Sequence, residues 1–215
     1  MLCVSIADMD FEQCKKILRD VNLAEIRLDK SDFSLRQVED IFSLPVKLIA
    51  TYRPGKISEK ERKDFLITAV EAGAAYVDIE IEAEDSYIKI IIEAARKREC
   101  KAIVSYHNFE NTPAKTELPA IVDRCFDRGA DIAKIACRVL CEADSARILS
   151  LYDCPAGAQG KIIALGMGEK GKITRVAAPL LGAPFTFAAL SPGQKTAPGQ
   201  LDIETLRKIL DLVKP

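Results

Sequence analysis

The sequence predicts a single-domain α/β protein, a (β/α)8 TIM barrel that spans residues 1–215. Short β-rich runs alternate with amphipathic helical stretches eight times along the chain, and polar residues gather where the strand segments end. Strict alternation of this kind implies parallel strands joined by right-handed crossovers. Eight units in 215 residues match the smaller members of this architecture.

The eight strand–helix units follow one another without a long insertion. Their expected ranges, strand first and helix second, are 2–6 with 11–20, 24–28 with 35–42, 46–52 with 59–72, 76–81 with 86–97, 102–106 with 118–128, 132–136 with 143–151, 161–165 with 175–181, and 185–190 with 203–213. Several strands are short and apolar, as expected where helices cover a parallel sheet. The helices carry apolar residues three and four apart, such as Ile203, Leu206 and Leu210.

An open, doubly wound sheet is the competing architecture. It would usually have fewer units and a glycine-rich turn after the first strand. Here that turn reads Ser5-Ile6-Ala7-Asp8 and contains no glycine. The barrel is therefore the better prediction.

Composition excludes several functional classes. The formal net charge of −1 argues against a general electrostatic affinity for nucleic acid or anionic membranes. No uninterrupted apolar run reaches the roughly 18 residues that a membrane helix needs. The chain starts directly on the strand segment Leu2–Ile6, which resembles neither a signal peptide nor a transit peptide. We therefore expect a cytoplasmic protein.

The seven cysteines show no metal-ligand spacing. Cys137 and Cys141 are four residues apart, but no second ligand pair and a single histidine are available to complete a zinc site. We expect reduced, mostly buried thiols and no bound metal.

Lys134 is the strongest candidate for a catalytic residue. It lies within an apolar strand segment, flanked by Ala133 and Ile135, where a charged side chain is costly to bury. A dry or cationic pocket would favour the neutral amine, which can attack a ketone to form an imine. The alternative is a lysine that reaches the barrel rim or pairs with Glu80. Spacing alone leaves both readings open.

His107 is the only histidine in the chain, and it ends the strand segment before that of Lys134. It is the one side chain expected to titrate near neutral pH, so it is a candidate general base. A histidine that merely caps the strand is the alternative.

Further charged residues fall at other strand ends. Glu25 and Arg27 share one face of the second strand, Arg53 ends the third, and Arg175 follows the seventh. Arginines at these places suit the bidentate recognition of a carboxylate, although a ring of structural ion pairs is equally compatible. The glycines of the segment 166–171 would suit a phosphate, but Glu169 would repel one.

Six motifs lie in order on successive strands. They are Glu25-x-Arg27-x-Asp29, Thr51-Tyr52-Arg53, Ser105-x-His107-Asn108-Phe109, Gly129-Ala130-Asp131-x-x-Lys134-x-Ala136, Met167 with Arg175 eight residues on, and Ala197-Pro198-Gly199-Gln200. Each motif is weak alone. Together, over nearly the whole chain, they resemble the type I 3-dehydroquinate dehydratases, lyases of the shikimate pathway of aromatic amino acid biosynthesis.

The resemblance implies a mechanism without a metal or dissociable cofactor. Lys134 would form an imine with 3-dehydroquinate, and His107 would act as general acid and base. Arg175, helped by Gln200, would hold the substrate carboxylate. The remaining pocket residues would be Ser5, Glu25, Arg27, Arg53, Met167 and Thr196. The resemblance also suggests a homodimer.

The sequence departs from the family pattern at three places. A glutamate that pairs with the histidine in many members is missing, because Arg53 is followed by Pro54-Gly55-Lys56-Ile57. Asn108 stands in place of an aspartate, and Thr196 in place of a serine. What orients His107 is therefore an open question.

Two rival functions remain at this point. A class I aldolase or transaldolase-like barrel also uses a strand lysine, and it would bind phosphate with the glycine-rich segment 166–171. A degenerate barrel that binds a metabolite without turnover is the second, and the missing glutamate after Arg53 is the feature that favours it.

Overall fold

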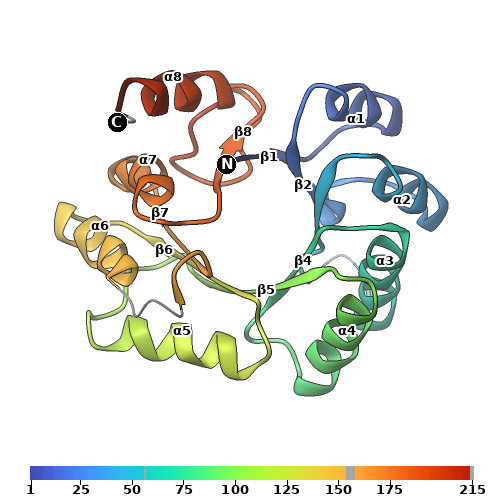
Figure 1. Cartoon of the computed structure of the whole chain (residues 1–215), viewed down its shortest axis with the longest axis horizontal. Coiled ribbons are helices and arrows are strands. Elements are labelled where there is room, and N and C mark those ends of the chain that lie inside the picture. The colour runs from blue at the N-terminus through green and yellow to red at the C-terminus, as the bar shows by residue number, and fades with distance from the viewer. Residues whose placement is uncertain (56, 154–157, 214–215) are drawn as a thin grey trace.

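The computed structural model describes residues 1–55, 57–153 and 158–213. It confirms the barrel: Figure 1 shows a ring of strands enclosed by helices. The strands are β1 (Leu2–Ile6), β2 (Leu23–Arg27), β3 (Lys47–Thr51), β4 (Tyr76–Glu80), β5 (Lys101–Asn108), β6 (Ile132–Arg138), β7 (Ile162–Met167) and β8 (Thr186–Ala189). The helices are α1 (Phe11–Leu18), α2 (Leu35–Phe42), α3 (Glu59–Ala72), α4 (Asp85–Lys97), α5 (Glu117–Asp127), α6 (Glu142–Leu149), α7 (Lys172–Leu180) and α8 (Ile203–Val213).

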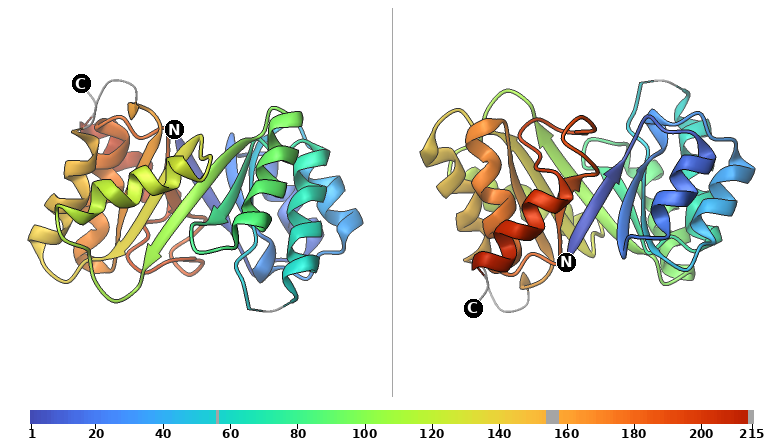
Figure 2. Two further views of the ribbon diagram at one scale, coloured as in Figure 1. Left: turned by 90° about the horizontal axis from the view of Figure 1, so that it is seen from below. Right: turned by 90° about the horizontal axis from the view of Figure 1, so that it is seen from above.

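All pairs of adjacent strands are parallel, and the hydrogen-bonded order runs β7-β6-β5-β4-β3-β2-β1-β8. In the described part of the chain no ladder joins β7 to β8, so the ring has one seam there. Among the described residues, side-chain packing and a backbone hydrogen bond help to bridge the seam. Leu165 and Phe187 belong to one buried cluster, and the N–H of Gly168 donates to the carbonyl oxygen of Pro198 at 3.1 Å. Figure 2 shows the helices packed on the outside of the strands in two further views.

Local sequence explains where the helices begin and end. Ser34 with Gln37 and Ser58 with Glu61 form capping boxes that satisfy the first amide groups of α2 and α3. Helix α3 ends at Gly73, whose φ of 122° is a conformation that glycine adopts readily.

Three elements differ from the sequence prediction in a way that matters for the site. Strands β5 and β6 each extend two residues beyond their expected ends, so His107 and Asn108 are still paired with Ala136 and Cys137. The backbone ladder continues because its hydrogen bonds do not depend on which side chains the residues carry. Helix α7 starts at Lys172 rather than 175, so Arg175 lies in its first turns.

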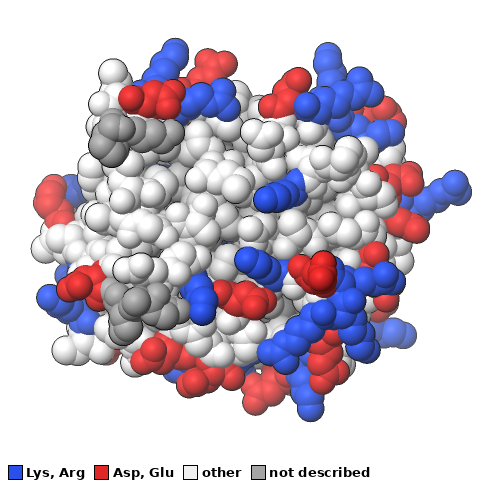
Figure 3. All heavy atoms as spheres, in the orientation of Figure 1, with Lys and Arg blue, Asp and Glu red and all other residues white. Residues whose placement is uncertain are grey.

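The surface agrees with the near-neutral composition. On the face that Figure 3 shows, acidic and basic side chains are interspersed around the periphery. No helix among the described residues is long and apolar enough to cross a membrane. Five of the six described cysteines are buried, and Cys141 is exposed. Cys154 lies outside the described residues.

Candidate active site

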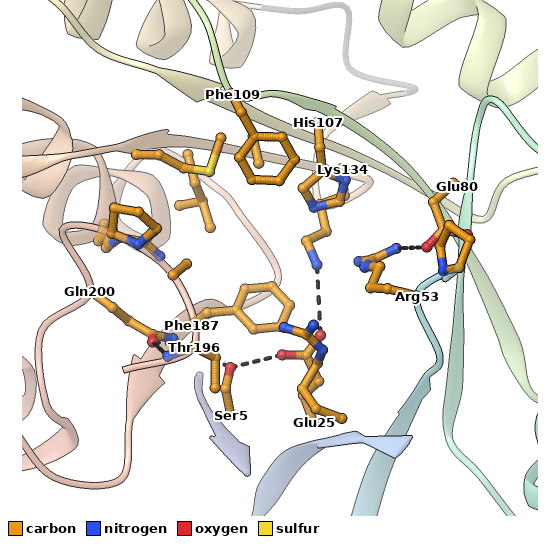
Figure 4. A pocket seen from close by; sticks show the side chains of 18 of the residues that line it. Ser5, Glu25, Arg53, Glu80, His107, Phe109, Lys134, Phe187, Thr196 and Gln200 are labelled. Carbon is orange, nitrogen blue, oxygen red and sulfur yellow. Dashed lines mark hydrogen bonds and ion pairs between the residues drawn. The ribbon is translucent and has the colours of Figure 1, made fainter. Parts of the chain in front are cut away.

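A cavity of about 510 Å³ lies at the carboxyl ends of the strands, and Figure 4 shows the side chains that line it. All ten residues singled out in the sequence line this one cavity: Ser5, Glu25, Arg27, Arg53, His107, Lys134, Met167, Arg175, Thr196 and Gln200. They come from β1, β2, β3, β5, β6, β7, α7 and the loop after β8, or from the turns next to these elements. The fold thus brings together residues that are up to 195 positions apart, as Ser5 and Gln200 are.

Lys134 points into the barrel, and the residue is only 6% exposed. Its Nζ donates to Oδ2 of Asp78 at 2.8 Å and lies 3.8 Å from Oε1 of Glu25. The ammonium also lies over the ring of Phe187, 4.3 Å from the centroid. The alternative partner considered from the sequence, Glu80, is wrong: the ion pair is made with Asp78. Residues two apart on a strand share a face but lie at different depths, and Asp78 is the deeper of the two.

Asp78 is in turn held by strands on either side of it. Its Oδ1 accepts a hydrogen bond from the Ser105 hydroxyl at 2.6 Å and lies 3.0 Å from Nη1 of Arg53. The same Arg53 nitrogen donates to Oε1 of Glu80 at 2.6 Å. We call Glu25, Arg53, Asp78, Glu80 and Lys134 the charge cluster.

Two pKa shifts follow from this packing. Burial alone would raise the pKa of Asp78, but Arg53 and Lys134 outweigh it and hold that pKa well below its usual range. Burial likewise opposes the charge on Arg53, yet Asp78 and Glu80 raise its pKa. Both groups are therefore charged throughout the physiological range.

Glu25 is fixed by hydroxyl groups from the two neighbouring strands. Its Oε2 accepts from Ser5 Oγ at 2.8 Å, and its Oε1 accepts from Thr51 Oγ1 at 3.0 Å. Gln200 Nε2 donates to Ser5 Oγ at 3.3 Å, and Gln200 Oε1 accepts from the backbone N–H of Thr196 at 2.9 Å. The loop after β8 is thus tied to the floor of the cavity.

His107 lies on β5, two residues beyond Ser105, whose register partner is Lys134. Its imidazole makes no hydrogen bond to another residue that the structure describes; the ring instead stacks on Phe109, with 6.1 Å between centroids and 14° between planes. Burial, and next the positive charges of Arg53 and Lys134, lower the pKa of His107 well below its ordinary value. The imidazole is therefore neutral at physiological pH, as a base must be.

The three departures from the family pattern have different outcomes. Asn108 shapes the loop after β5: its Oδ1 accepts from the N–H groups of Glu110 and Asn111 at 3.0 Å each. Thr196 keeps the hydroxyl, which lies 3.2 Å from Gln200 Oε1. Lys56, in the segment that lacks the usual glutamate, lies outside the described residues.

Arg175 contributes a cation of a different kind. It is 3% exposed and lines the cavity, and its Nε has no hydrogen-bond partner among the described residues. Burial lowers its pKa to about 10, so it still carries its charge near pH 7. A buried, charged and unpaired guanidinium is costly unless an anion joins it.

Arg27 is paired more locally than the sequence suggested. Its Nε and Nη2 donate to the two carboxylate oxygens of Asp29, at 2.9 and 2.7 Å. Its guanidinium therefore reaches the cavity with its charge already balanced.

The glycine-rich segment 166–171 is explained by packing. A Cβ on Gly166 would lie 2.6 Å from Val139 Cγ2, and one on Gly171 would lie 2.5 Å from the backbone of Gly166. The N–H groups of Gly166, Gly168 and Gly171 donate to Thr174 Oγ1, Pro198 O and Gly168 O. These amides are already used, which removes the argument for a phosphate there.

Several residues of the site were not among the sequence candidates. Asp78, Glu80, Ser105 and Thr51 complete the charge cluster or bond to it, while Phe109 and Phe187 supply aromatic walls. The sequence could have identified Asp78 and Glu80 as site residues, because these two carboxylates share a face of an otherwise apolar strand. Phe109 belongs to the motif around His107, whereas Phe187 had no signal, since an aromatic residue in a strand is usually part of the core.

Comparisons with known proteins agree with this geometry. The family described as Type I 3-dehydroquinase matches residues 2–215. The 3-dehydroquinate dehydratase of Methanococcus maripaludis is 33% identical over 222 residues, covering 99% of this chain and 100% of that protein. A bifunctional 3-dehydroquinate dehydratase/shikimate dehydrogenase of Arabidopsis thaliana is 36% identical over 219 residues, covering 97% of this chain and 35% of that protein.

A solved structure shows the same fold. The type I 3-dehydroquinate dehydratase from Clostridium difficile, crystallised with covalently modified comenic acid, superimposes with a TM-score of 0.85 at 26% identity. The match covers 99% of this chain and 91% of that one. The chain described here belongs to the type I 3-dehydroquinase family.

Proposed function

We propose that the protein dehydrates 3-dehydroquinate to 3-dehydroshikimate through an imine on Lys134, and that it serves the shikimate pathway. The observation that carries the proposal is a buried lysine and a neutral histidine that lie on adjacent strands and line the same cavity. The names of the full-length relatives support the same reaction.

The charge cluster suits imine formation. Lys134 attacks the C3 ketone as a free amine, and the resulting carbinolamine loses water to give a protonated imine. That cation occupies the place of the ammonium, where Asp78 and Glu25 already stabilise a positive charge. The protonated imine then acts as the electron sink for removal of the neighbouring C2 proton.

His107 moves the proton in the next steps. The neutral imidazole takes the C2 proton, the electron pair moves into the imine, and an enamine forms. The enamine expels the C1 hydroxyl, which leaves as water with the proton that His107 returns. Hydrolysis of the remaining imine releases 3-dehydroshikimate and restores the amine of Lys134.

The other lining residues bind the substrate. Arg175 has an unused Nε and an excess positive charge, so we assign it the substrate carboxylate, with the amide of Gln200 beside it. Ser5, Glu25, Arg27, Arg53 and Thr196 face the ring hydroxyls, and Met167 supplies an apolar wall.

One experiment tests the proposal. The purified protein is incubated with 3-dehydroquinate, the enone absorbance of the product is followed, and borohydride is added before peptide mapping. We expect turnover and a reduced adduct on Lys134. Lys134→Met abolishes both, whereas Lys101→Met, at the exposed start of β5, leaves both intact. His107→Ala retains the adduct but loses about 10²- to 10⁴-fold in turnover. Turnover without an adduct on Lys134 would refute the mechanism.

Location and assembly belong to the same proposal. We assign the protein to the cytoplasm, where buried thiols such as Cys3, Cys14 and Cys100 stay reduced. We also assign it the homodimer that the family resemblance implies, and sedimentation velocity on the purified protein distinguishes a dimer from a monomer.

A further inference from the structure

Arg62 is an unusual residue for an outer helix. It lies in the first turns of α3, in a run of charged residues, yet it is 5% exposed. Its Nη1 lies 3.0 Å from Oε2 of Glu80, and its guanidinium covers the ring of Tyr87 at 4.5 Å. It is absent from the residues that line the cavity, so it does not meet the substrate itself.

The ion pairs form an unbroken relay from α3 to Lys134. Glu80 offers Oε2 to Arg62 and Oε1 to Arg53, at 3.0 and 2.6 Å. Asp78 offers Oδ1 to Arg53 and Oδ2 to Lys134, at 3.0 and 2.8 Å. Each of the two carboxylates therefore uses a different oxygen for each of its two cations.

Charge balance gives the relay a consequence. Glu25, Asp78 and Glu80 oppose Arg53, Arg62 and Lys134, so three carboxylates face three cations. When Lys134 gives up its proton to react, the group carries one net negative charge. Without Arg62 the group would carry one net negative charge even while Lys134 is protonated. Loss of the Lys134 proton would then leave two net negative charges, which is less favourable.

We propose that Arg62 is a positioning residue for catalysis: through Glu80 and Arg53 it holds Asp78 against Lys134 and supplies the charge that lets the amine form. The proposal rests on the imine function assigned to Lys134. Other groups face that amine from several strands: Cys3 on β1, Glu25 on β2, Asp78 on β4, His107 on β5 and Phe187 on β8. Arg53, after β3, acts through Asp78. Arg62 is distinct from them because it acts from outside the barrel.

The test measures how fast the imine forms as a function of pH. Each variant is mixed with 3-dehydroquinate and cyanoborohydride, and the reduced adduct is followed by intact mass. In Arg62→Gln the pH of half-maximal adduct formation moves up by roughly one unit, the scale of one charge lost from a buried cluster. Arg62→Lys, which keeps the charge, stays close to the unmodified protein. Lys60→Gln removes an exposed cation from the same helix and leaves the profile in place.

Glu80→Gln provides the opposite change. Removing this negative charge moves the pH of half-maximal adduct formation down. In the double variant Glu80→Gln/Arg62→Gln that pH moves back up, whatever the level of turnover. This pair keeps the test valid if Arg62→Gln alone does not fold, because the double variant leaves no unpaired buried carboxylate at position 80.

The outcomes separate the two claims. If Arg62→Gln lowers stability or activity but leaves the pH profile in place, Arg62 is only structural and the inference is wrong. The same holds if Glu80→Gln and the double variant have the same profile. If the unmodified protein forms no adduct on Lys134 at any pH, the proposed function itself fails.

Discussion

The two sides of the cavity hold their charges in opposite ways. On the side of β2 to β6, cations and carboxylates rise from the strands and are paired within the protein, as Lys134 is with Asp78. On the side of β7 and β8, Arg175 extends from a helix and has an Nε without a partner among the described residues. Its neighbours Thr196 and Gln200 come from a loop.

The difference separates charges that are balanced within the protein from the charge assigned to the substrate carboxylate. Groups that must act on the substrate are fixed in advance by rigid strands, so they need no rearrangement when the reaction starts. The group assigned to the carboxylate is left unsatisfied, so its burial is compensated only when an anion arrives. Substitutions on the first side should therefore affect stability, and those on the second side should affect affinity.

The largest effect is expected at Asp78. Asp78→Asn removes the negative charge between Arg53 and Lys134 and leaves two buried cations without their common partner. We expect the free energy of unfolding to fall by about 3–5 kcal/mol, the usual cost of breaking a buried ion pair. Urea denaturation measures it. Asp85→Asn, at an exposed partner of Arg128, should change it by less than about 1 kcal/mol. Equal losses of unfolding free energy in Asp78→Asn and Asp85→Asn would contradict the structural role of Asp78.

Arg175 should show the reverse behaviour. Arg175→Met removes a charge that the free protein does not pair, so the free energy of unfolding stays the same or rises. The KM for 3-dehydroquinate rises roughly 10- to 100-fold, as expected when a bidentate carboxylate contact is lost. Steady-state kinetics and denaturation of the same sample give both quantities. A clear loss of stability with unchanged KM would place Arg175 on the structural side.

A smaller effect comes from His107 and depends on pH. Burial, then Arg53 and Lys134, depress its folded-state pKa, so below about pH 6.5 the unfolded chain binds a proton that the folded chain does not. Stability is therefore lost as pH falls from 6.5 toward that lowered pKa, by at most about 1.4 kcal/mol per pH unit. His107→Gln removes this slope. Denaturation of both proteins between pH 7 and 5 gives their free energies of unfolding, and the difference between these should change as pH falls. A constant difference would argue against a depressed pKa of His107.

The fold could be predicted closely from the sequence because the spacing of apolar residues shows which face of each helix or strand is buried. Helices 35–42, 59–72 and 203–213 and strand 2–6 have the expected bounds. The ends of β5 and β6 were predicted two residues too early. The cavity lining was predictable for the same reason as the fold: side chains at the carboxyl ends of barrel strands converge.

The partnerships within the site could not be predicted in the same way. A strand pattern shows which face Asp78 and Glu80 share, but not which of them lies at the depth of the Lys134 ammonium. Arg62 was hidden because it lies in the run Glu59-Lys60-Glu61-Arg62-Lys63-Asp64, which has the composition of an exposed helix face. Only the three-dimensional packing on Glu80 and Tyr87 distinguishes it from its neighbours.

The seam between β7 and β8 gives the barrel uneven stiffness. Around the rest of the ring, any widening must stretch a continuous ladder of backbone hydrogen bonds. At the seam, the described residues offer side-chain packing, the shared cover of α7 and a hydrogen bond from the N–H of Gly168 to Pro198 in place of a ladder. We therefore expect the ring to yield more easily at the seam, beside α7 and Arg175, than around Lys134, whose strand β6 is hydrogen-bonded on both sides. Widening at the seam is expected to leave the spacing of Lys134 and His107 unchanged, because β5 and β6 stay paired.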